Sequence, residues 1–323
     1  MRGRGGRLQV EGISGRPSAA GGGGMEDGPW NPDASGWFCA GYGPLRRLGT
    51  GSGGMSVSGP GQRFATLFCE DAVLSESEEW LKRSWARYLQ DRREPQRQLV
   101  EGVKEMLSDG LLPCGMRVVE ISVDHVVVED RQGLRLPLRD ASDGCRGIYA
   151  TILDLVYGIG KVHGEEGLFA KREGRTVVDL PGVVLIDEIE AHLHPAWQRE
   201  IPRWLKAHFP KIQFLVTTHS PLVVQAADPH GIFTLPTPGE SDSAPRRLDP
   251  REEDKIRLGR AERTLVGSTF GLRHSRSTWA VEQIERWKLL DAKRRAGVDL
   301  LGPEMREFHR LEEQMRVAFE DER

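Results

Sequence analysis

The chain has few cysteines and no long apolar run, and each of these absences argues against a particular class of protein. None of its four cysteines in 323 residues forms a CxxC pair, which excludes a disulfide framework and a cysteine zinc site. Purely aliphatic runs stop at about four residues, far short of the ~20 that a membrane-spanning helix needs. No apolar core follows the basic N-terminus, as a signal peptide would require. We therefore expect a cytoplasmic protein with no membrane association.

The sequence also lacks a complete phosphate-binding loop of the form GxxxxGK[ST]. Residues 49–56, GTGSGGMS, have the glycine spacing, but Met55 stands where that loop has lysine. Methionine carries no charge that could hold the β- and γ-phosphates of a nucleotide. Arginines precede this segment and Gly-Pro-Gly follows it, instead of a buried strand and a helix. We therefore interpret residues 49–56 as a flexible loop.

The first sixty residues are rich in glycine, with 18 of the 38 glycines of the chain. Such a stretch loses too much conformational entropy on ordering to fold alone. We therefore predict that residues 1–60 are largely disordered. An exception is the segment 37–47, WFCAGYGPLRR, which mixes aromatic residues with a Gly-Pro turn. The sequence assigns it no role.

The most informative stretch, residues 182–225, predicts a strand, a helix and a second strand. An apolar run, VVLI at 183–186, predicts a strand buried on both faces, and Asp187 and Glu188 follow it at once. Pro195 suits the first turn of the helix. A second buried strand is predicted over residues 212–216, and it is followed by Thr-Thr-His-Ser at 217–220. In such a βαβ unit both strands deliver polar side chains to the same edge of one sheet.

These residues carry a resemblance to a known family. A strand ending in Asp-Glu, followed by one ending in Thr-His-Ser-Pro, resembles the Walker B and switch-histidine segments of ABC-type ATPase heads. The phrase LIDEIEAHLHPAWQ is similar to that of AAA-family ATPases of the SMC/OLD-like group, several of which belong to bacterial anti-phage systems. The resemblance covers roughly residues 36–271. It implies an α/β, P-loop NTPase-like ABC ATPase head that is N-terminally incomplete, because it has no Walker A motif. The fold implied has a mostly parallel central sheet, a small antiparallel sheet and a helical insert.

A second motif begins at Ser142. Apolar residues recur with helical spacing over 142–159, and Ser142 suits the N-cap of that helix. In the related heads this position holds the ABC signature, here Ser142, Asp143, Gly144 and Arg146. The resemblance implies that the signature contacts the γ-phosphate of ATP held by the opposite subunit of a dimer. A helix N-terminus with exposed amides suits such an anion.

The resemblance also implies roles for the two strand ends, with ATP and Mg²⁺ as cofactors. Asp187 would bind Mg²⁺ through water, and Glu188 would act as the general base toward the attacking water. His219 would contact the γ-phosphate and that water. The partner would be a second copy of the chain or a complete ATPase subunit.

Two alternatives stay open. Without a phosphate-binding loop the chain could be a degenerate, non-hydrolysing head that partners a complete ATPase, and we expect weak or no turnover by the chain alone. The other alternative is a metal-dependent hydrolase, because imidazole and carboxylate groups gather in residues 187–219 and suit transition metals. That set comprises Asp187, Glu188, Glu190, His192, His194, His208 and His219.

The sequence identifies no effector. A nuclease would have to be a separate subunit, since no nuclease domain is visible in the chain. DNA binding is plausible by family, but the formal net charge of −3 gives it no support.

The rest of the chain completes the predicted organisation. Residues 75–112 predict a helical insert that is divided or kinked at Pro95, and residues 116–139 predict a small antiparallel sheet. We expect a polar loop over 161–180 and a charged surface linker from the 240s to 263. Three parts result, namely residues 1–60, an ATPase core over 61–272, and a charged helical tail over 273–323.

Overall fold

A computed structural model describes residues 38–46, 62–69, 71–112, 115–236, 244–267 and 269–319. The segment 49–56 lies outside these ranges, and of residues 1–60, which were predicted to be disordered, only 38–46 lie within them. The chain divides into two compact units, each described here by itself. The first contains the chain up to Asp187 together with His208–Leu215, and the second contains Glu188–Ala207 and Val216–Arg323. The three-part division drawn from the sequence stays a prediction.

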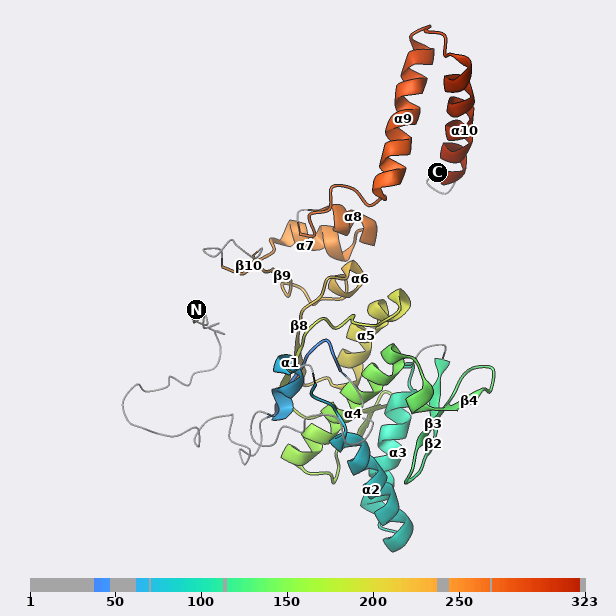
Figure 1. Cartoon of the computed structure of the whole chain (residues 1–323). Coiled ribbons are helices and arrows are strands. Elements are labelled where there is room, and N and C mark those ends of the chain that lie inside the picture. Colours follow the sequence, from blue (N-terminus) through green and yellow to red (C-terminus); the bar gives the residue numbers. More distant parts are fainter. Residues whose placement is uncertain are drawn as a thin grey trace. The chain divides into compact units, whose positions relative to one another are not determined.

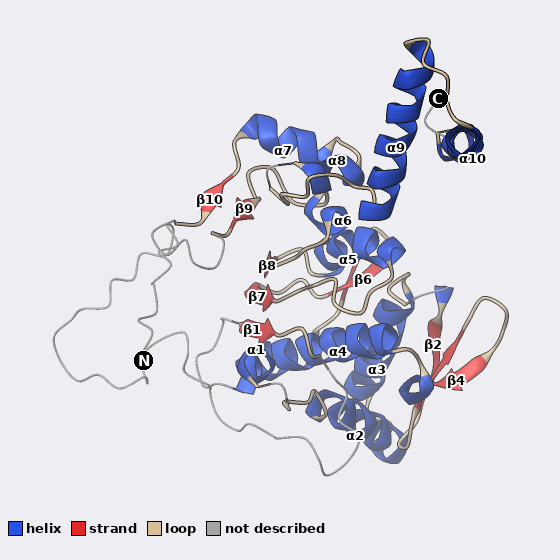
Figure 2. Cartoon of the chain, turned by 45° about the horizontal axis from the view of Figure 1, so that its top comes forward, coloured by secondary structure: helices blue, strands red, loops and turns tan. Residues whose placement is uncertain are grey.

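The first unit contains a three-stranded sheet. Its strands are β1 (Cys39–Tyr42), β7 (Gly182–Ile186) and β8 (Ile212–Val216), in the order β1-β7-β8, and Figure 1 labels β8. β1 pairs with β7 in parallel, with Tyr42 opposite Ile186. β8 runs parallel to β7, because Gly182 N–H donates to the Lys211 carbonyl before the two strands and Ile189 N–H to the Thr217 carbonyl beyond them. Figure 2 shows the three strands stacked side by side. The two strands predicted over 183–186 and 212–216 are confirmed, but the second strand is not buried as predicted, because Leu215 and Val216 are 47% and 38% exposed.

The strand β1 lies in the segment 37–47, to which the sequence assigned no role. All four of its residues are buried, and Phe38 and Tyr42 are almost completely inaccessible. Glycine at 182 permits the close approach, since a Cβ there would lie 2.9 Å from both the ring and the carbonyl oxygen of Phe38. A four-residue strand that contains Gly41 and is followed by Gly43 is too short for a clear periodic signal.

Three long helices pack together in the first unit, and one of them lies against this sheet. They are α2 (Glu76–Asp91), α3 (Glu94–Ser108) and α4 (Asp143–His163), following the short α1 (Ala65–Phe68) and the 3-10 turn η2 (Gln62–Phe64). α4 packs on β1, and α2 and α3 pack on each other and on α4. The predicted insert is confirmed as two helices, with Pro95 in the first turn of α3. The chain reverses between them at Arg92, which has a φ of 53°.

Two small antiparallel sheets complete the first unit. The predicted one is confirmed, with strands β2 (Arg117–Ile121), β3 (Val126–Glu129) and β4 (Arg135–Pro137), followed by the 3-10 turn η4 (Leu138–Asp140). The prediction of a loop over 161–180 was wrong. α4 continues to His163, and β5 (Ala170–Arg172) and β6 (Arg175–Val177) form a hairpin. Its two turn residues, Glu173 and Gly174, have φ of 51° and 79°, as a tight hairpin turn requires.

The second unit is mostly helical. Its elements are α5 (Pro195–His208, whose last residue belongs to the first unit), α6 (Pro221–Val224), β9 (Phe233–Thr234), β10 (Arg246–Arg247), α7 (Pro250–Arg257) and α8 (Ala261–Val266). Ile232, Leu248 and Ile256 form a small apolar core. The predicted surface linker is therefore wrong over α7, which is anchored by that core.

The predicted helical tail is confirmed as a hairpin of α9 (Thr278–Arg295) and α10 (Gly302–Ala318), drawn in orange and red in Figure 1. The two helices pack on each other around their own apolar cluster, which consists of Leu290, Leu300, Phe308 and Leu311. None of the described helices combines the length and the apolarity needed to cross a bilayer.

Candidate functional site

Asp187 is fixed by its backbone at the carboxyl end of β7. Its N–H donates to the carbonyl of Tyr42 at 2.7 Å. Its own carbonyl accepts from Arg46 Nη1 at 3.4 Å. The residue is half-buried, so its side chain starts from a well-defined backbone at the rim of the sheet.

The next residue, Glu188, has a left-handed backbone. Its φ is 44°, a conformation that is uncommon for residues other than glycine. Its N–H donates to Thr217 Oγ1 at 2.8 Å, and Ile189 N–H donates to the Thr217 carbonyl at 3.1 Å. Thr217 therefore holds the turn that projects the Glu188 side chain, which is exposed. Strained backbone that the surroundings hold in place is a common mark of functional sites.

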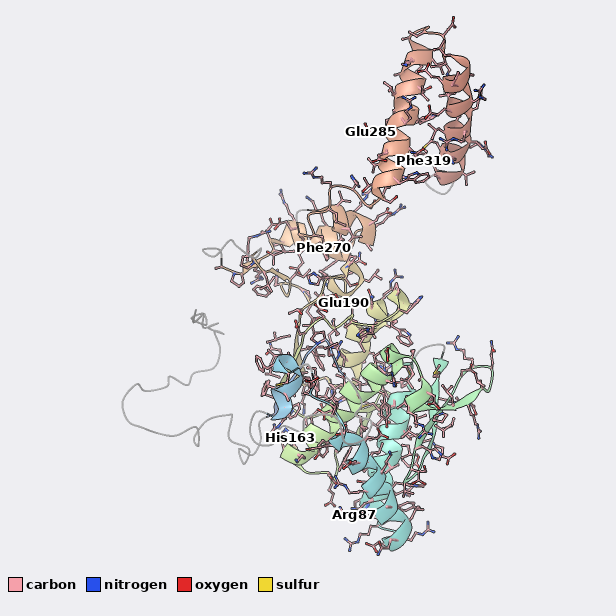
Figure 3. All side chains as sticks on the ribbon, viewed as in Figure 1. Arg87, His163, Glu190, Phe270, Glu285 and Phe319 are labelled. Atoms are coloured by element: carbon pink, nitrogen blue, oxygen red, sulfur yellow. The ribbon has the colours of Figure 1, made fainter. Side chains whose placement is uncertain are left out.

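His219 is attached to the loop that carries Glu188. Its backbone N–H donates to Glu190 Oε1, and Figure 3 labels Glu190 in this part of the chain. The following residue, Ser220, is buried and donates from Oγ to Gln198 Oε1 at 2.7 Å. The structure thus joins the segment 217–220 to the segment that follows β7, so Glu188 and His219 lie on two hydrogen-bonded loops.

The predicted signature residues lie together at the start of α4. Ser142 is the N-cap, with Oγ accepting the Cys145 N–H at 3.4 Å. Arg146 forms an ion pair with Asp143 and donates to the Arg139 carbonyl at 3.3 Å. Ser142 and Asp143 are exposed, whereas Gly144 is buried. The predicted cap is confirmed, and the serine hydroxyl lies at the surface.

Arg46 connects this helix to the end of β7. A Cβ added at Gly147, in the first turn of α4, would lie 3.3 Å from the Arg46 carbonyl oxygen. The side chain of the same arginine reaches the Asp187 carbonyl. Arg46 does not stand out in the sequence, because it follows the short strand β1 without any motif of its own.

A partly buried pair of side chains links Tyr42 to α4. Tyr42 Oη donates to Asp154 Oδ2 at 3.0 Å. Burial raises the pKa of the Asp154 carboxyl from 3.8 to about 6, and the Tyr42 hydrogen bond opposes that rise. Burial and the neighbouring Asp154 also hold the pKa of Tyr42 well above its usual value. Because the Tyr42 carbonyl accepts the Asp187 N–H, this pair anchors the residue that fixes Asp187.

The raised pKa predicts how stability depends on pH. The fold prefers the protonated Asp154 carboxyl, so its contribution to the free energy of unfolding is complete below pH 3.8 and is lost as the pH rises through about 6. Asp154→Asn should raise the free energy of unfolding at pH 8 by about 1–2 kcal/mol. Two pKa units correspond to about 3 kcal/mol, reduced here because part of the residue is accessible.

Urea unfolding of both proteins at pH 4 and pH 8 measures this effect, and the difference should vanish at pH 4. Asp124→Asn, at an exposed position of the same unit, is the matched control and should change nothing. An equal gain at both pH values would contradict the assignment to ionisation.

The histidines do not gather into a metal site. His208 is buried and lies 3.1 Å from Asp109 Oδ2 through Nε2, so it faces α3. His194 Nδ1 accepts the Ala196 N–H at 3.2 Å at the start of α5. Within the described ranges, no group of three or more His, Cys, Asp or Glu side chains is arranged to hold a metal ion. The geometry therefore gives no support to the metal-dependent hydrolase.

Comparison with known proteins finds similarity in the segment that contains Ser142, Asp187, Glu188 and His219. Residues 69–225 match the family described as "AAA domain, putative AbiEii toxin, Type IV TA system". A Septu protein PtuA of Bacillus thuringiensis is 33% identical over 140 residues, which are 43% of this chain and 34% of that protein. The SMC head domain from Thermotoga maritima aligns with 51% of each chain at 18% identity and a TM-score of 0.33.

The matched segment contains both strand ends and the Ser142 helix, and it is similar to an AAA domain. Its relatives include, besides PtuA, the retron Ec83 probable ATPase of Escherichia coli, 34% identical over 120 residues, which are 37% of this chain and 20% of that protein. The resemblance to anti-phage-defence-like AAA ATPases is thereby confirmed. The chain spans no more than about a third of the length of these two curated relatives.

Proposed function

We propose that this chain is an ATP-binding and ATP-hydrolysing head that acts by nucleotide-dependent dimerisation. One observation carries the proposal. The loops after β7 and β8 are joined from Glu188 to Thr217 and from Glu190 to His219, so a carboxylate and an imidazole share one edge of a parallel sheet. Ligands of open α/β sheets bind at the carboxyl ends of the strands.

Asp187 fits a magnesium ligand in this proposal. Mg²⁺ takes one or two protein carboxylates and completes its octahedron with water and phosphate oxygens, so a single half-buried aspartate on a fixed backbone is a suitable donor. When bound, the ion neutralises charge that develops on the phosphates. Glu188, exposed on its fixed turn, takes the proton of the attacking water. His219 donates a hydrogen bond to the γ-phosphate.

The Ser142 helix completes the site of a second head. Its exposed N-terminus with a small hydroxyl residue is suited to a phosphate. Turnover by the chain alone is slow, because the GTGSGGMS segment carries no lysine for the β- and γ-phosphates.

A degenerate head that partners a complete ATPase is the second candidate, and the edge of the sheet favours it. β8 is an outer strand of the sheet in the part of the chain that the structure describes, and Leu215 and Val216 are 47% and 38% exposed. Parallel sheets are normally covered on both faces, and exposed edges invite another strand. A complete ATPase subunit would provide a strand for this edge together with its phosphate-binding loop.

Light scattering after size-exclusion chromatography, with and without ATP and Mg²⁺, tests the proposal when combined with a phosphate-release assay. The proposed function predicts a dimer that forms only with ATP and a slow release of phosphate. Dimerisation without phosphate release would favour the degenerate head. If ATP produced neither association nor turnover, the proposal would be wrong for this chain.

A further inference from the structure

We infer that Glu190 is a positioning residue for His219, an inference that rests on the proposed function of the site. Glu190 lies in the turn after β7, and its Oε1 accepts the backbone N–H of His219 across 29 residues of sequence. A hydrogen bond to a charged carboxylate is roughly twice as strong as a neutral one. This contact therefore fixes where the chain turns after β8. It also fixes the backbone position from which the His219 imidazole extends.

The rest of the carboxylate is also enclosed. Glu190 Oε2 is buried and has no hydrogen-bond partner among the described residues. A carboxylate that gives up hydration on one oxygen is costly unless its other oxygen is well bound. The hydrogen bond from the His219 amide to Oε1 offsets part of this desolvation cost. The buried carboxylate is therefore held in place by the loop that bears His219.

The two loops hold each other reciprocally. The Glu188 N–H is bound by Thr217, which belongs to the loop of His219, and the His219 N–H is bound by Glu190, which belongs to the loop of Glu188. Removing the Glu190 side chain breaks the second link and leaves the first. Glu190 should consequently affect hydrolysis through His219 alone, while Glu188 keeps its turn.

A double-mutant cycle in ATP turnover tests the role. Glu190→Ala should lower kcat about tenfold, the effect of losing one hydrogen bond to a charged group, and change KM for ATP by less than about twofold. Glu190→Gln keeps an amide oxygen as acceptor and should stay within about threefold of the unmodified chain. In a His219→Ala background, Glu190→Ala should cause no further loss, because coupled residues are not additive. Additive losses in the double variant would overturn the positioning role.

Amide exchange gives a readout that does not need turnover. In Glu190→Ala the His219 amide should exchange with solvent at least about tenfold faster by NMR, since its acceptor is gone, and in Glu190→Gln it should stay protected. Glu200→Ala removes a carboxylate that is exposed on α5 and should change neither quantity. Unchanged exchange in Glu190→Ala would refute the contact. A chain without turnover would count against the proposed function, whereas the exchange experiment would still decide whether Glu190 holds His219.

Discussion

Glu188→Gln is expected to lower the rate of ATP hydrolysis by about 100-fold or more, the usual contribution of a general base. Glutamine has the same shape and hydrogen-bonding reach but cannot take the proton of the attacking water. The left-handed backbone at 188 and the Thr217 hydrogen bond do not depend on the side-chain charge, so the fold should be unchanged. Phosphate release measures the rate, and a fluorescent ATP analogue measures binding, which should change by less than about twofold because ground-state contacts persist.

The matched control for this variant is Glu200→Gln, which makes the same chemical change at an exposed position of α5. It should leave turnover unaltered. The ATP-dependent dimer should persist longer in Glu188→Gln than in the unmodified chain, because the nucleotide is no longer consumed. Full turnover in Glu188→Gln would rule this residue out as the base.

Ser142→Asp is expected to weaken ATP-dependent dimerisation by about tenfold or more, because a carboxylate placed at the phosphate contact repels it, and each tenfold corresponds to about 1.4 kcal/mol. Aspartate is as good an N-cap as serine, so α4 should remain intact. The variant therefore separates a role toward nucleotide from the capping of the helix. Light scattering with ATP and Mg²⁺ measures the association, and thermal unfolding without nucleotide checks the fold.

The same exchange at Ser277 provides the control. Ser277 caps α9 by accepting the Ala280 N–H, and Ser277→Asp changes the charge of the chain equally while lying in the helical hairpin. Dimerisation should be unaffected by it. Equal effects of the two substitutions would attribute the loss to net charge, and undiminished dimerisation in Ser142→Asp would exclude the N-terminus of α4 from the dimer contact.

The central part of the fold was predictable because its signals are local and strong. The strand, helix and strand over 182–216 follow from apolar runs bounded by polar residues, with Pro195 opening α5 as expected. Ser142 caps α4 for the same reason, since the side chain and its amide partner are three residues apart. Such segments can be predicted from sequence because their local conformational preference agrees with their tertiary packing.

Other elements had signals that were overlooked or too weak. α7 begins with a capping box, in which Asp249 and Glu252 each bind the backbone of the other, and the sequence Asp-Pro-Arg-Glu carries that signature. The β5–β6 hairpin turns on Glu173-Gly174, and Gly at a hairpin turn is a known indicator. β1 is different, because its burial depends on β7 and α4, which lie more than a hundred residues away.

The sequence predicts which residues form the candidate site, and their roles stay predictions. It does not predict the hydrogen bonds that position them. Asp187, Glu188 and His219 stand out by residue type and by position after strands. Nothing local indicates that Thr217 holds the Glu188 amide or that Glu190 holds the His219 amide, because each contact joins residues 29 positions apart. Long-range hydrogen bonds of this kind leave no periodic trace in a sequence.

The left-handed turn at residue 188 has a thermodynamic consequence. Glycine would occupy that conformation without steric conflict, so a side chain there leaves the protein about 1 kcal/mol less stable than the backbone alone would allow. In the proposed function, the carboxylate that takes the proton is therefore held at a position where its side chain lowers the free energy of unfolding.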